Sequence, residues 1–313
     1  MKIAMGSATI KPPSSVNPTN DCQRFINAFP LITIEPSLSR TTLMTQSSGA
    51  FNTLIRGCGQ MLWLSGLMMS LVACADTGPR DILQYQFQIE AEQPHDPTLF
   101  TQGLLKRGSR FYESGGQYGQ SRLVIYQDNG RQVERERPLA ARYFAEGLTE
   151  LNNELYLLTW REKTLLVYDA GTLEPLREMS YSGEGWGLTN DGEHLIRSDG
   201  SAQLYFHAPE DFSVQRQITV TENGKAVTRL NELEYVDGAI WANIWYSDRL
   251  IQIDPDNGRV IGSLDLAELV RTAQPETSGA VLNGIAYDAE HNQFWVTGKL
   301  WPTLYRLSLS PEP

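Results

Sequence analysis

The chain has 313 residues, of which 41% are hydrophobic and 10% aromatic, and this composition excludes collagen, low-complexity disorder and a protein with many membrane spans. Acidic residues outnumber basic ones by 37 to 26, which gives a formal net charge of −11. Because a surface of this sign repels phosphate backbones, we expect no nucleic-acid partner.

The N-terminal segment has the features of an exported leader. Residues 1–43 are rich in Ser, Thr, Pro and Asn without a hydrophobic period, and they precede an alternative start at Met44. Residues 61–73 form an uncharged run, MLWLSGLMMSLVA, which Arg56 precedes. This charge order and length are typical of a secretory signal peptide, and the run is too short to span a bilayer. A buried hydrophobic helix is the alternative interpretation.

The end of this run resembles the lipobox of bacterial lipoproteins. It reads Leu71-Val72-Ala73-Cys74, and in that motif the cysteine becomes the lipid-bearing N-terminus. Ala75 rather than Asp follows, which by the same resemblance indicates sorting to the outer membrane of a Gram-negative cell. We therefore expect a leader and signal peptide over residues 1–73, a lipid anchor on Cys74 within a linker over 74–80, and a protein exported to the periplasmic side of the outer membrane.

Beyond residue 80 the sequence is typical of an all-β protein. Short runs of strand-forming residues are separated by turn signals such as Asn190-Asp191-Gly192 and Asp256-Asn257-Gly258. A helical period occurs only around residues 264–272, where we expect one short helix. The spacing of the turns fits a sandwich, a barrel or a propeller.

An internal repeat decides among these three folds. A motif ending in Gly-Leu or a similar pair recurs at steps of 44, 40, 45 and 52 residues, and two strand-like runs follow each copy. A period of roughly 40–45 residues with about four strands is the signature of a β-propeller. We therefore predict a five-bladed β-propeller with four-stranded blades over residues 81–313. The copies are Gln102-Gly103-Leu104, Glu146-Gly147-Leu148, Trp186-Gly187-Leu188, Asn231-Glu232-Leu233 and Asn283-Gly284-Ile285.

The fifth repeat is one strand short. It begins near Val281 and ends at Leu309, which leaves room for only three strands. Residues 85–89 alternate apolar and polar side chains and have no hairpin partner beside them in the sequence. We predict that this N-terminal strand closes the last blade as its outer strand, because pairing of the first strand with the last blade protects open edges.

The first residue of each copy should line the central channel, because the innermost strand of every blade faces the axis. Most of these residues are polar, which packing alone does not favour. Trp160 and Trp245 lie fourteen residues after Glu146 and Asn231, and Lys299 lies sixteen after Asn283. Phe100, Phe144 and Trp186 would join them around one end of the channel. In the alternative interpretation, the ring residues bond only to one another or to water and the aromatic residues belong to the core.

Signals for metal and nucleophile chemistry are weak. The four histidines fall in unrelated contexts, and the chain has neither a CxxC pair nor a Gly-x-Ser-x-Gly elbow. We therefore expect no catalytic metal and no cofactor, while the sequence stays compatible with a structural divalent cation.

Eight short segments carry a more specific signal. They are PHDP at 94–97, FTQGL at 100–104, EGL at 146–148, GWGL at 185–188, LNELEY at 230–235, WANIW at 241–245, LNGI at 282–285 and VTGK at 296–299. In this order and spacing they resemble the plant and bacterial type of glutaminyl cyclase, the glutaminyl-peptide cyclotransferase built on a five-bladed propeller. The resemblance runs from about residue 85 to residue 309.

The resemblance implies an activity and a role for each site residue. The activity is conversion of an N-terminal glutaminyl residue of peptides or proteins to pyroglutamate with release of ammonia, without the catalytic zinc of the animal-type enzymes. By the same resemblance, Glu146 is the general acid and base. The polar substrate-binding residues are Gln102, Asn231 and Lys299, and the aromatic walls are Phe100, Phe144, Trp160, Trp186 and Trp245. We expect a monomer that meets the membrane only through its lipid anchor.

Two other functions are compatible with the sequence. A non-catalytic outer-membrane propeller lipoprotein could use the same channel mouth as a scaffold or peptide-binding module, although a scaffold has no need for a single carboxyl among aromatic residues. A metal-dependent propeller hydrolase would need several oxygen ligands on the axis, and the ring offers one carboxylate.

Overall fold

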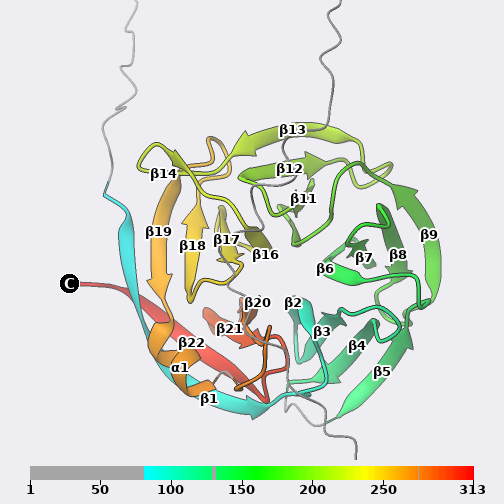
Figure 1. Ribbon diagram of the computed structural model, residues 1–313, viewed down its shortest axis with the longest axis horizontal. Coiled ribbons are helices and arrows are strands. Elements are labelled where there is room, and N and C mark those ends of the chain that lie inside the picture. Colours follow the sequence, from blue (N-terminus) through cyan, green and yellow to red (C-terminus); the bar gives the residue numbers. More distant parts are fainter. Residues whose placement is uncertain (1–80, 129–131, 274) are drawn as a thin grey trace, which may run out of the picture. The chain divides into compact units, whose positions relative to one another are not determined.

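The computed structural model describes residues 81–128, 132–273 and 275–313, which form strands arranged in a ring around an axis, with one short helix (Figure 1). The expected leader, signal peptide, linker and lipid anchor at Cys74 lie outside the described residues. Among the described residues, no helix has both the length and the apolar character needed to cross a bilayer.

The described strands form five four-stranded blades, as the repeat predicted, and each blade is numbered here in chain order from its inner strand outwards. Blade one contains β2 (Thr101–Arg107), β3 (Arg110–Gly115), β4 (Arg122–Gln127) and β5 (Val133–Pro138). Blade two contains β6 (Ala145–Leu151), β7 (Glu154–Thr159), β8 (Thr164–Asp169) and β9 (Pro175–Ser180). Blade three contains β10 (Leu188–Asn190), β11 (Leu195–Ser198), β12 (Gln203–His207) and β13 (Val214–Thr219).

Blade four contains β16 (Leu230–Val236), β17 (Ala239–Ile244), β18 (Arg249–Ile253) and β19 (Val260–Asp265). Blade five contains β20 (Leu282–Asp288), β21 (Gln293–Gly298), β22 (Thr303–Pro311) and β1 (Leu83–Pro94). The inner strands contact one another in the closed cycle β2, β6, β10, β16, β20 and back to β2. A small hairpin, β14 (Thr221–Glu222) and β15 (Lys225–Ala226), and the helix α1 (Ala267–Ala273) lie outside the blades.

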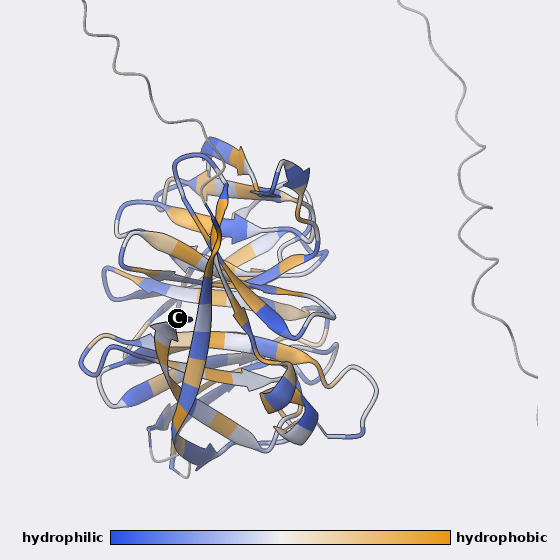
Figure 2. Cartoon of the chain, turned by 90° about the vertical axis from the view of Figure 1, so that its left-hand side faces the viewer, coloured by the Kyte–Doolittle hydropathy of each residue, from blue (hydrophilic) through white to orange (hydrophobic). Residues whose placement is uncertain are grey.

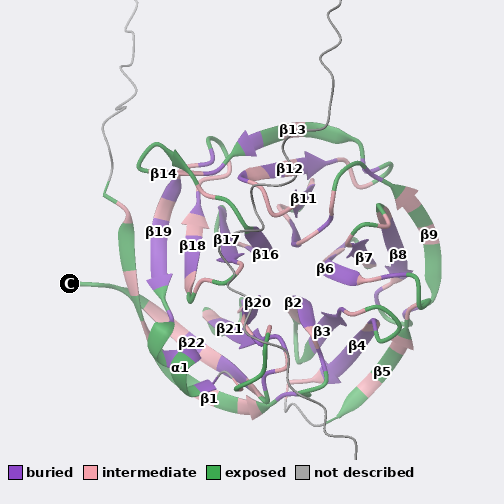
Figure 3. Cartoon of the chain, viewed as in Figure 1, coloured by how far each residue is buried: buried purple, intermediate pink, exposed green. Residues whose placement is uncertain are grey.

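Burial within a blade follows from the stacking of blades face to face. In blade two, β8 reads TLLVYD and is buried at four consecutive residues, because neighbouring blades cover both of its faces. The outer strand β9 reads PLREMS and is exposed or half-buried throughout. In Figure 3 the outer strands of blades one, three and five are likewise mostly exposed or half-buried, whereas β19 of blade four is mostly buried. In Figure 2 hydrophilic residues interrupt hydrophobic ones along the outer strands.

The inner strands approach so closely that the repeated motif needs glycine. A Cβ on Gly103 would lie 2.6 Å from the backbone nitrogen of Leu148 in the next blade. In the fourth copy Glu232 replaces this glycine and reaches across the channel. Its carboxyl oxygens accept hydrogen bonds from the backbone N–H groups of Leu104, at 3.4 Å, and of Ile285, at 2.8 Å. The fourth blade is therefore tied to the first and the fifth.

The N-terminal strand closes the ring as predicted. β1 pairs antiparallel with β22 from Tyr85 to Pro94, which makes it the outer strand of blade five. It is longer than the predicted residues 85–89. Its start, Leu83–Tyr85, also pairs in parallel with β19, so blades four and five form one eight-stranded sheet. The predicted short helix is present as α1, with Leu269 and Val270 packed in the core of these two blades.

Candidate active site

A cavity of about 230 Å³ opens at the end of the channel where the inner strands begin and the second strands end. It is smaller than the roughly 300–1,000 Å³ of sites for drug-sized ligands, so it suits a single small group rather than a long peptide. The cavity brings together all nine of the polar and aromatic residues predicted to form the site and adds Tyr246 and Gly279. The predicted residues are Phe100, Gln102, Phe144, Glu146, Trp160, Trp186, Asn231, Trp245 and Lys299.

A shift in strand register aims the ring residues at the axis. The pairing of β6 with β7 skips between Ala145 and Leu148, so Glu146 falls in the irregular segment. The same skip occurs in β2 around Gln102 and in β16 around Asn231. Bulges of this kind re-aim side chains and interrupt the ladder, which explains why these residues face the cavity rather than a neighbouring strand.

Glu146 is a buried carboxyl in an apolar setting. It is 4% exposed, and Gln102 donates a hydrogen bond from Nε2 to its Oε1 at 3.2 Å. Burial raises the pKa of Glu146 well above its ordinary value. The positive charge of Lys299 opposes this rise in pKa, whereas the negative charges of Glu184 and Glu162 add to it. Burial thus makes the protonated form of this carboxyl more favourable than it is for a carboxyl in water.

Lys299 is the cation of the cavity. Its side chain is buried, and its ammonium lies 4.8 Å from the centroid of the Phe100 ring. Burial lowers the pKa of Lys299 to about 8, against the opposing effect of the Glu146 charge. The two charges interact without a hydrogen bond between them.

The aromatic walls consist of two groups of rings. Phe144 packs edge-on against Phe100, with ring centroids 6.3 Å apart, and lies 5.5 Å from Trp160. In the second group, the rings of Trp186 and Trp245 meet with centroids 5.5 Å apart and planes at 88°. Behind Trp186 lies Gly200, which has a φ of +79° and where a Cβ would sit 2.6 Å from the indole. These contacts hold the rings in fixed orientations.

Asn231 presents a free acceptor. Its side chain is buried, and among the described residues its Oδ1 has no hydrogen-bond partner. Because a buried polar atom without a partner is costly, this oxygen is suited to accept an N–H from a bound molecule. Asn283, the fifth ring residue, does not line the cavity. Its Nδ2 instead donates to the backbone oxygen of Thr101 at 2.9 Å.

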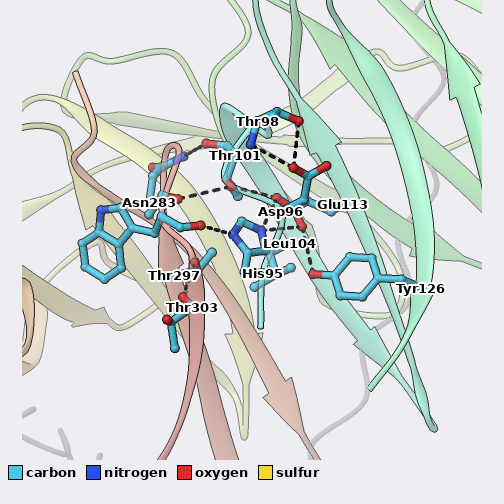
Figure 4. Close-up of polar contacts among 12 residues, drawn as sticks. His95, Asp96, Thr98, Thr101, Leu104, Glu113, Tyr126, Asn283, Thr297 and Thr303 are labelled. Carbon is cyan, nitrogen blue, oxygen red and sulfur yellow. Dashed lines mark hydrogen bonds and ion pairs between the residues drawn. The ribbon is translucent and has the colours of Figure 1, made fainter. Parts of the chain in front are cut away.

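A buried polar network includes Thr101, the residue before Gln102 (Figure 4). The imidazole Nε2 of His95 is 3.0 Å from both carboxylate oxygens of Glu113, and its Nδ1 is 2.6 Å from the backbone oxygen of Trp301. Thr101 and Tyr126 donate hydroxyl hydrogen bonds to the same carboxylate at 2.7 and 2.8 Å. Gln102 thus follows directly after a residue that this network fixes.

Besides Tyr246 and Gly279 in the cavity lining, the sequence analysis missed a carboxylate beside the cavity. Glu184 accepts hydrogen bonds from the indole N–H groups of Trp160 and Trp186. The only signal was its position two residues before the ring residue Trp186, in the segment Gly-Glu-Gly-Trp. Among the described residues, no three His, Cys, Asp or Glu side chains gather in a way that could hold a metal ion.

The chain is similar to proteins of one family. A family model described as glutamine cyclotransferase matches residues 63–309. A glutaminyl-peptide cyclotransferase of Arabidopsis thaliana is 39% identical over 228 residues, which cover 72% of this chain and 71% of that protein. The crystal structure of Myxococcus xanthus glutaminyl cyclase matches with a TM-score of 0.71 at 36% sequence identity, over 74% of this chain and 100% of that one.

Proposed function

The chain belongs to the glutamine cyclotransferase family, and from this premise we propose that it converts an N-terminal glutaminyl residue of a peptide or protein to pyroglutamate and ammonia. The observation that carries the proposal is a carboxyl of raised pKa, Glu146, enclosed with a buried cation and an unpartnered amide oxygen by aromatic walls. This setting favours catalysis over the alternative of a non-catalytic scaffold.

The reaction needs no nucleophile from the protein. The α-amine of the substrate attacks its own side-chain amide carbon, so a new C–N bond closes the ring and the original C–N bond breaks. Holding the side chain folded back in a near-attack shape supplies much of the rate advantage, and a narrow aromatic cavity does this. Water is kept from the amide by the same walls, which are Phe100, Phe144, Trp160, Trp186 and Trp245.

Glu146 moves the proton in this scheme. An α-amine has a pKa of about 8, so part of the substrate is already neutral at physiological pH. The Glu146 carboxylate accepts a proton from the attacking amine and delivers it to the departing amide nitrogen, which leaves as ammonia. A pKa raised by burial suits a group that must serve as base and then as acid.

Two polar residues contact the substrate in this scheme, and a third holds Glu146. We assign to the buried Lys299 ammonium the stabilisation of negative charge on the amide oxygen in the transition state. Asn231 Oδ1 accepts a hydrogen bond from a substrate N–H group, which satisfies its unpartnered oxygen. Gln102 keeps the Glu146 carboxyl in place through its 3.2 Å hydrogen bond.

Ammonia release tests the proposal. The purified protein is incubated with a dipeptide that begins with Gln, with and without a chelator, and ammonia and the cyclic product are measured. We expect stoichiometric ammonia and pyroglutamyl peptide in both conditions. No ammonia from folded protein would favour the scaffold, and loss of activity only with chelator would favour a metal-dependent enzyme.

We also propose that Cys74 carries a lipid that holds the protein at the periplasmic side of the outer membrane. The proposal is supported by the signal-peptide and lipobox pattern of residues 61–74. In a Gram-negative host, the full chain should take up labelled fatty acid and sediment with the outer membrane. Replacement of Cys74 by Ser should abolish both, and equal labelling of that variant would overturn the proposal.

A further inference from the structure

One carboxylate joins two of the indoles that enclose the cavity. The Oε2 atom of Glu184 accepts hydrogen bonds from Trp160 Nε1 at 2.8 Å and from Trp186 Nε1 at 3.0 Å. Trp160 follows β7 in blade two, whereas Trp186 precedes β10 in blade three. The other oxygen, Oε1, accepts from Arg161 Nε at 3.1 Å, and the Arg161 guanidinium lies 3.7 Å from the centroid of the Trp160 ring. The carboxylate therefore connects walls that belong to different blades.

The backbone that carries Glu184 is itself fixed. Gly185 donates its N–H to the backbone oxygen of Trp160 at 3.0 Å, and a Cβ on Gly185 would lie 2.9 Å from the backbone oxygen of Thr159. The buried Arg197 donates a hydrogen bond to the backbone oxygen of Glu184. A carboxylate on such a segment can set the orientation of the indoles rather than follow it.

We propose that Glu184 is a positioning residue, which holds Trp160 and Trp186 at the orientation that folds the glutaminyl side chain and whose negative charge acts on Glu146. This inference rests on the proposed function. Glu184 touches neither the reacting atoms nor the interior of the cavity, since it is not among the residues that line it.

The charge on Glu184 persists across the neutral range. Burial would raise its pKa, but the hydrogen bonds from Trp186, Trp160 and Arg161 outweigh this and lower it. The charged groups that act on Glu146 are Lys299, which lowers its pKa, and Glu184 and Glu162, which raise it beyond the effect of burial. Removing the Glu184 charge alone should therefore lower the pKa of Glu146.

Two substitutions separate the two effects. Glu184→Gln keeps a carbonyl oxygen that can accept both indole N–H groups but removes the charge, whereas Glu184→Ala removes both. Ammonia release is measured as kcat and KM over pH, and near-ultraviolet circular dichroism reports the order of the indoles. The matched control is Glu210→Gln, which removes one negative charge from an exposed carboxyl in the loop after β12.

We expect Glu184→Ala to raise KM by about tenfold, the factor for a lost hydrogen bond to a charged group, and to weaken the indole signal. Glu184→Gln should keep KM and the indole signal near wild type while the acidic limb of its kcat/KM profile moves to lower pH. The control should change none of these quantities. An unmoved acidic limb in Glu184→Gln, or a wild-type KM in Glu184→Ala, would overturn the proposal.

Two further variants keep the test decisive if Glu184→Ala fails to fold. Trp160→Phe and Trp186→Phe each delete one N–H donor and retain most of the ring area. If Glu184 positions the indoles through these two bonds, which together form the proposed clamp, each variant should raise KM by itself, and a wild-type KM in both would contradict the clamp. If wild-type protein releases no ammonia, the proposed function fails. The near-ultraviolet circular dichroism of Glu184→Ala then still tests whether Glu184 orders the two indoles, so the two failures are distinguishable.

Discussion

At the scale of single residues, the cavity combines two buried groups of opposite charge. Burial raises the pKa of Glu146 and lowers that of Lys299 to about 8, so each group is destabilised in its charged form. The charge of each group partly offsets the effect of burial on the pKa of the other. Burial therefore makes proton uptake by Glu146 and proton release by Lys299 easier than for the same groups in water, which suits the proposed proton transfer.

Replacement of Glu146 by Gln should abolish most of the turnover. The amide has nearly the same shape but cannot accept and return a proton, and general acid–base catalysis contributes roughly 10²–10⁴-fold to a rate. We expect a loss of this size in kcat for ammonia release, with an unchanged melting temperature. Glu174→Gln, at an exposed carboxyl, is the control. Turnover close to wild type in the folded Glu146→Gln protein would remove this residue from the mechanism.

Replacement of Lys299 by Met should move the acidic limb of the kcat/KM profile upwards. The charge of Lys299 lowers the pKa of Glu146, and its removal leaves burial and the carboxylates of Glu184 and Glu162 to raise that pKa further. We also expect kcat/KM at neutral pH to fall by about 10²-fold, as for loss of one group that stabilises an oxyanion. Lys299→Arg keeps the charge and should keep the limb in place. A limb that stays in place for Lys299→Met would contradict the assigned interaction.

The sequence predicted these residues but not every contact among them. Alignment of the repeats places Glu146, Trp160 and Lys299 at one end of the channel, because equivalent positions in successive blades share a height along the axis. Glu184 stands two residues before its ring residue, where Phe100 and Phe144 stand in the first two copies, so the position repeats but the residue type does not. Its role depends on where two indole N–H groups from different blades point, and this is set by tertiary packing that a one-dimensional pattern does not contain.

At the scale of elements, the first strand joins two blades. β1 completes blade five through β22 and also pairs with β19 of blade four. Tyr85 lies at this junction, where its ring is 5.2 Å from that of Trp241 and its hydroxyl donates to Gln252 Oε1 at 3.0 Å. The strand alternates, so Gln86 points away from this contact and bonds to Ser310 on the outside.

Tyr85→Ala should therefore destabilise the protein far more than Gln86→Ala. Removing a partly buried aromatic ring from a packed junction costs roughly 1–3 kcal/mol, whereas exposed substitutions usually stay within about 0.5 kcal/mol. The free energy of unfolding of each variant, obtained from urea titrations and compared with that of wild type, measures the two losses. Equal losses for the two variants would show that β1 contributes through its backbone pairing alone.

The alternation of residues 85–89 predicted this strand, and the missing fourth strand of the fifth repeat predicted its place in the last blade. Its extension to Pro94 and its parallel pairing with β19 could not be predicted, because a run such as Glu90 to Gln93 lacks an apolar period and pairs through backbone groups. The register shifts around Glu146 escape sequence analysis for a similar reason. They depend on the geometry of the ladder, which many residue types can adopt.

At the scale of the whole molecule, the ring is locked where its last blade meets its first. His95 lies between β1 and β2, and its backbone N–H donates to the oxygen of Pro302 at 2.9 Å. Its side chain bridges the backbone oxygen of Trp301 in blade five and the carboxylate of Glu113 in blade one. Both ring nitrogens face acceptors, so the charged imidazolium satisfies them best.

The stability that this contact supplies should depend on pH. Although burial opposes the charged ring, the Glu113 carboxylate and its hydrogen bond raise the pKa of His95 above 6.5. Because the folded-state pKa exceeds the unfolded one, the contribution is fully present below pH 6.5 and is lost as pH rises through the raised pKa. The measurement is the free energy of unfolding of wild type minus that of His95→Leu, taken at pH 6 and at pH 9.

We expect a difference of about 3–5 kcal/mol at pH 6, as for a broken buried ion pair, and a clearly smaller one at pH 9. Subtraction removes the titrating groups that do not contact His95, because these have the same surroundings in the two proteins. His291→Gln, whose side chain is 51% exposed, serves as the control and should show little dependence of this kind. A difference for His95→Leu that stays constant from pH 6 to pH 9 would mean that His95 closes the ring as a neutral hydrogen-bonding group.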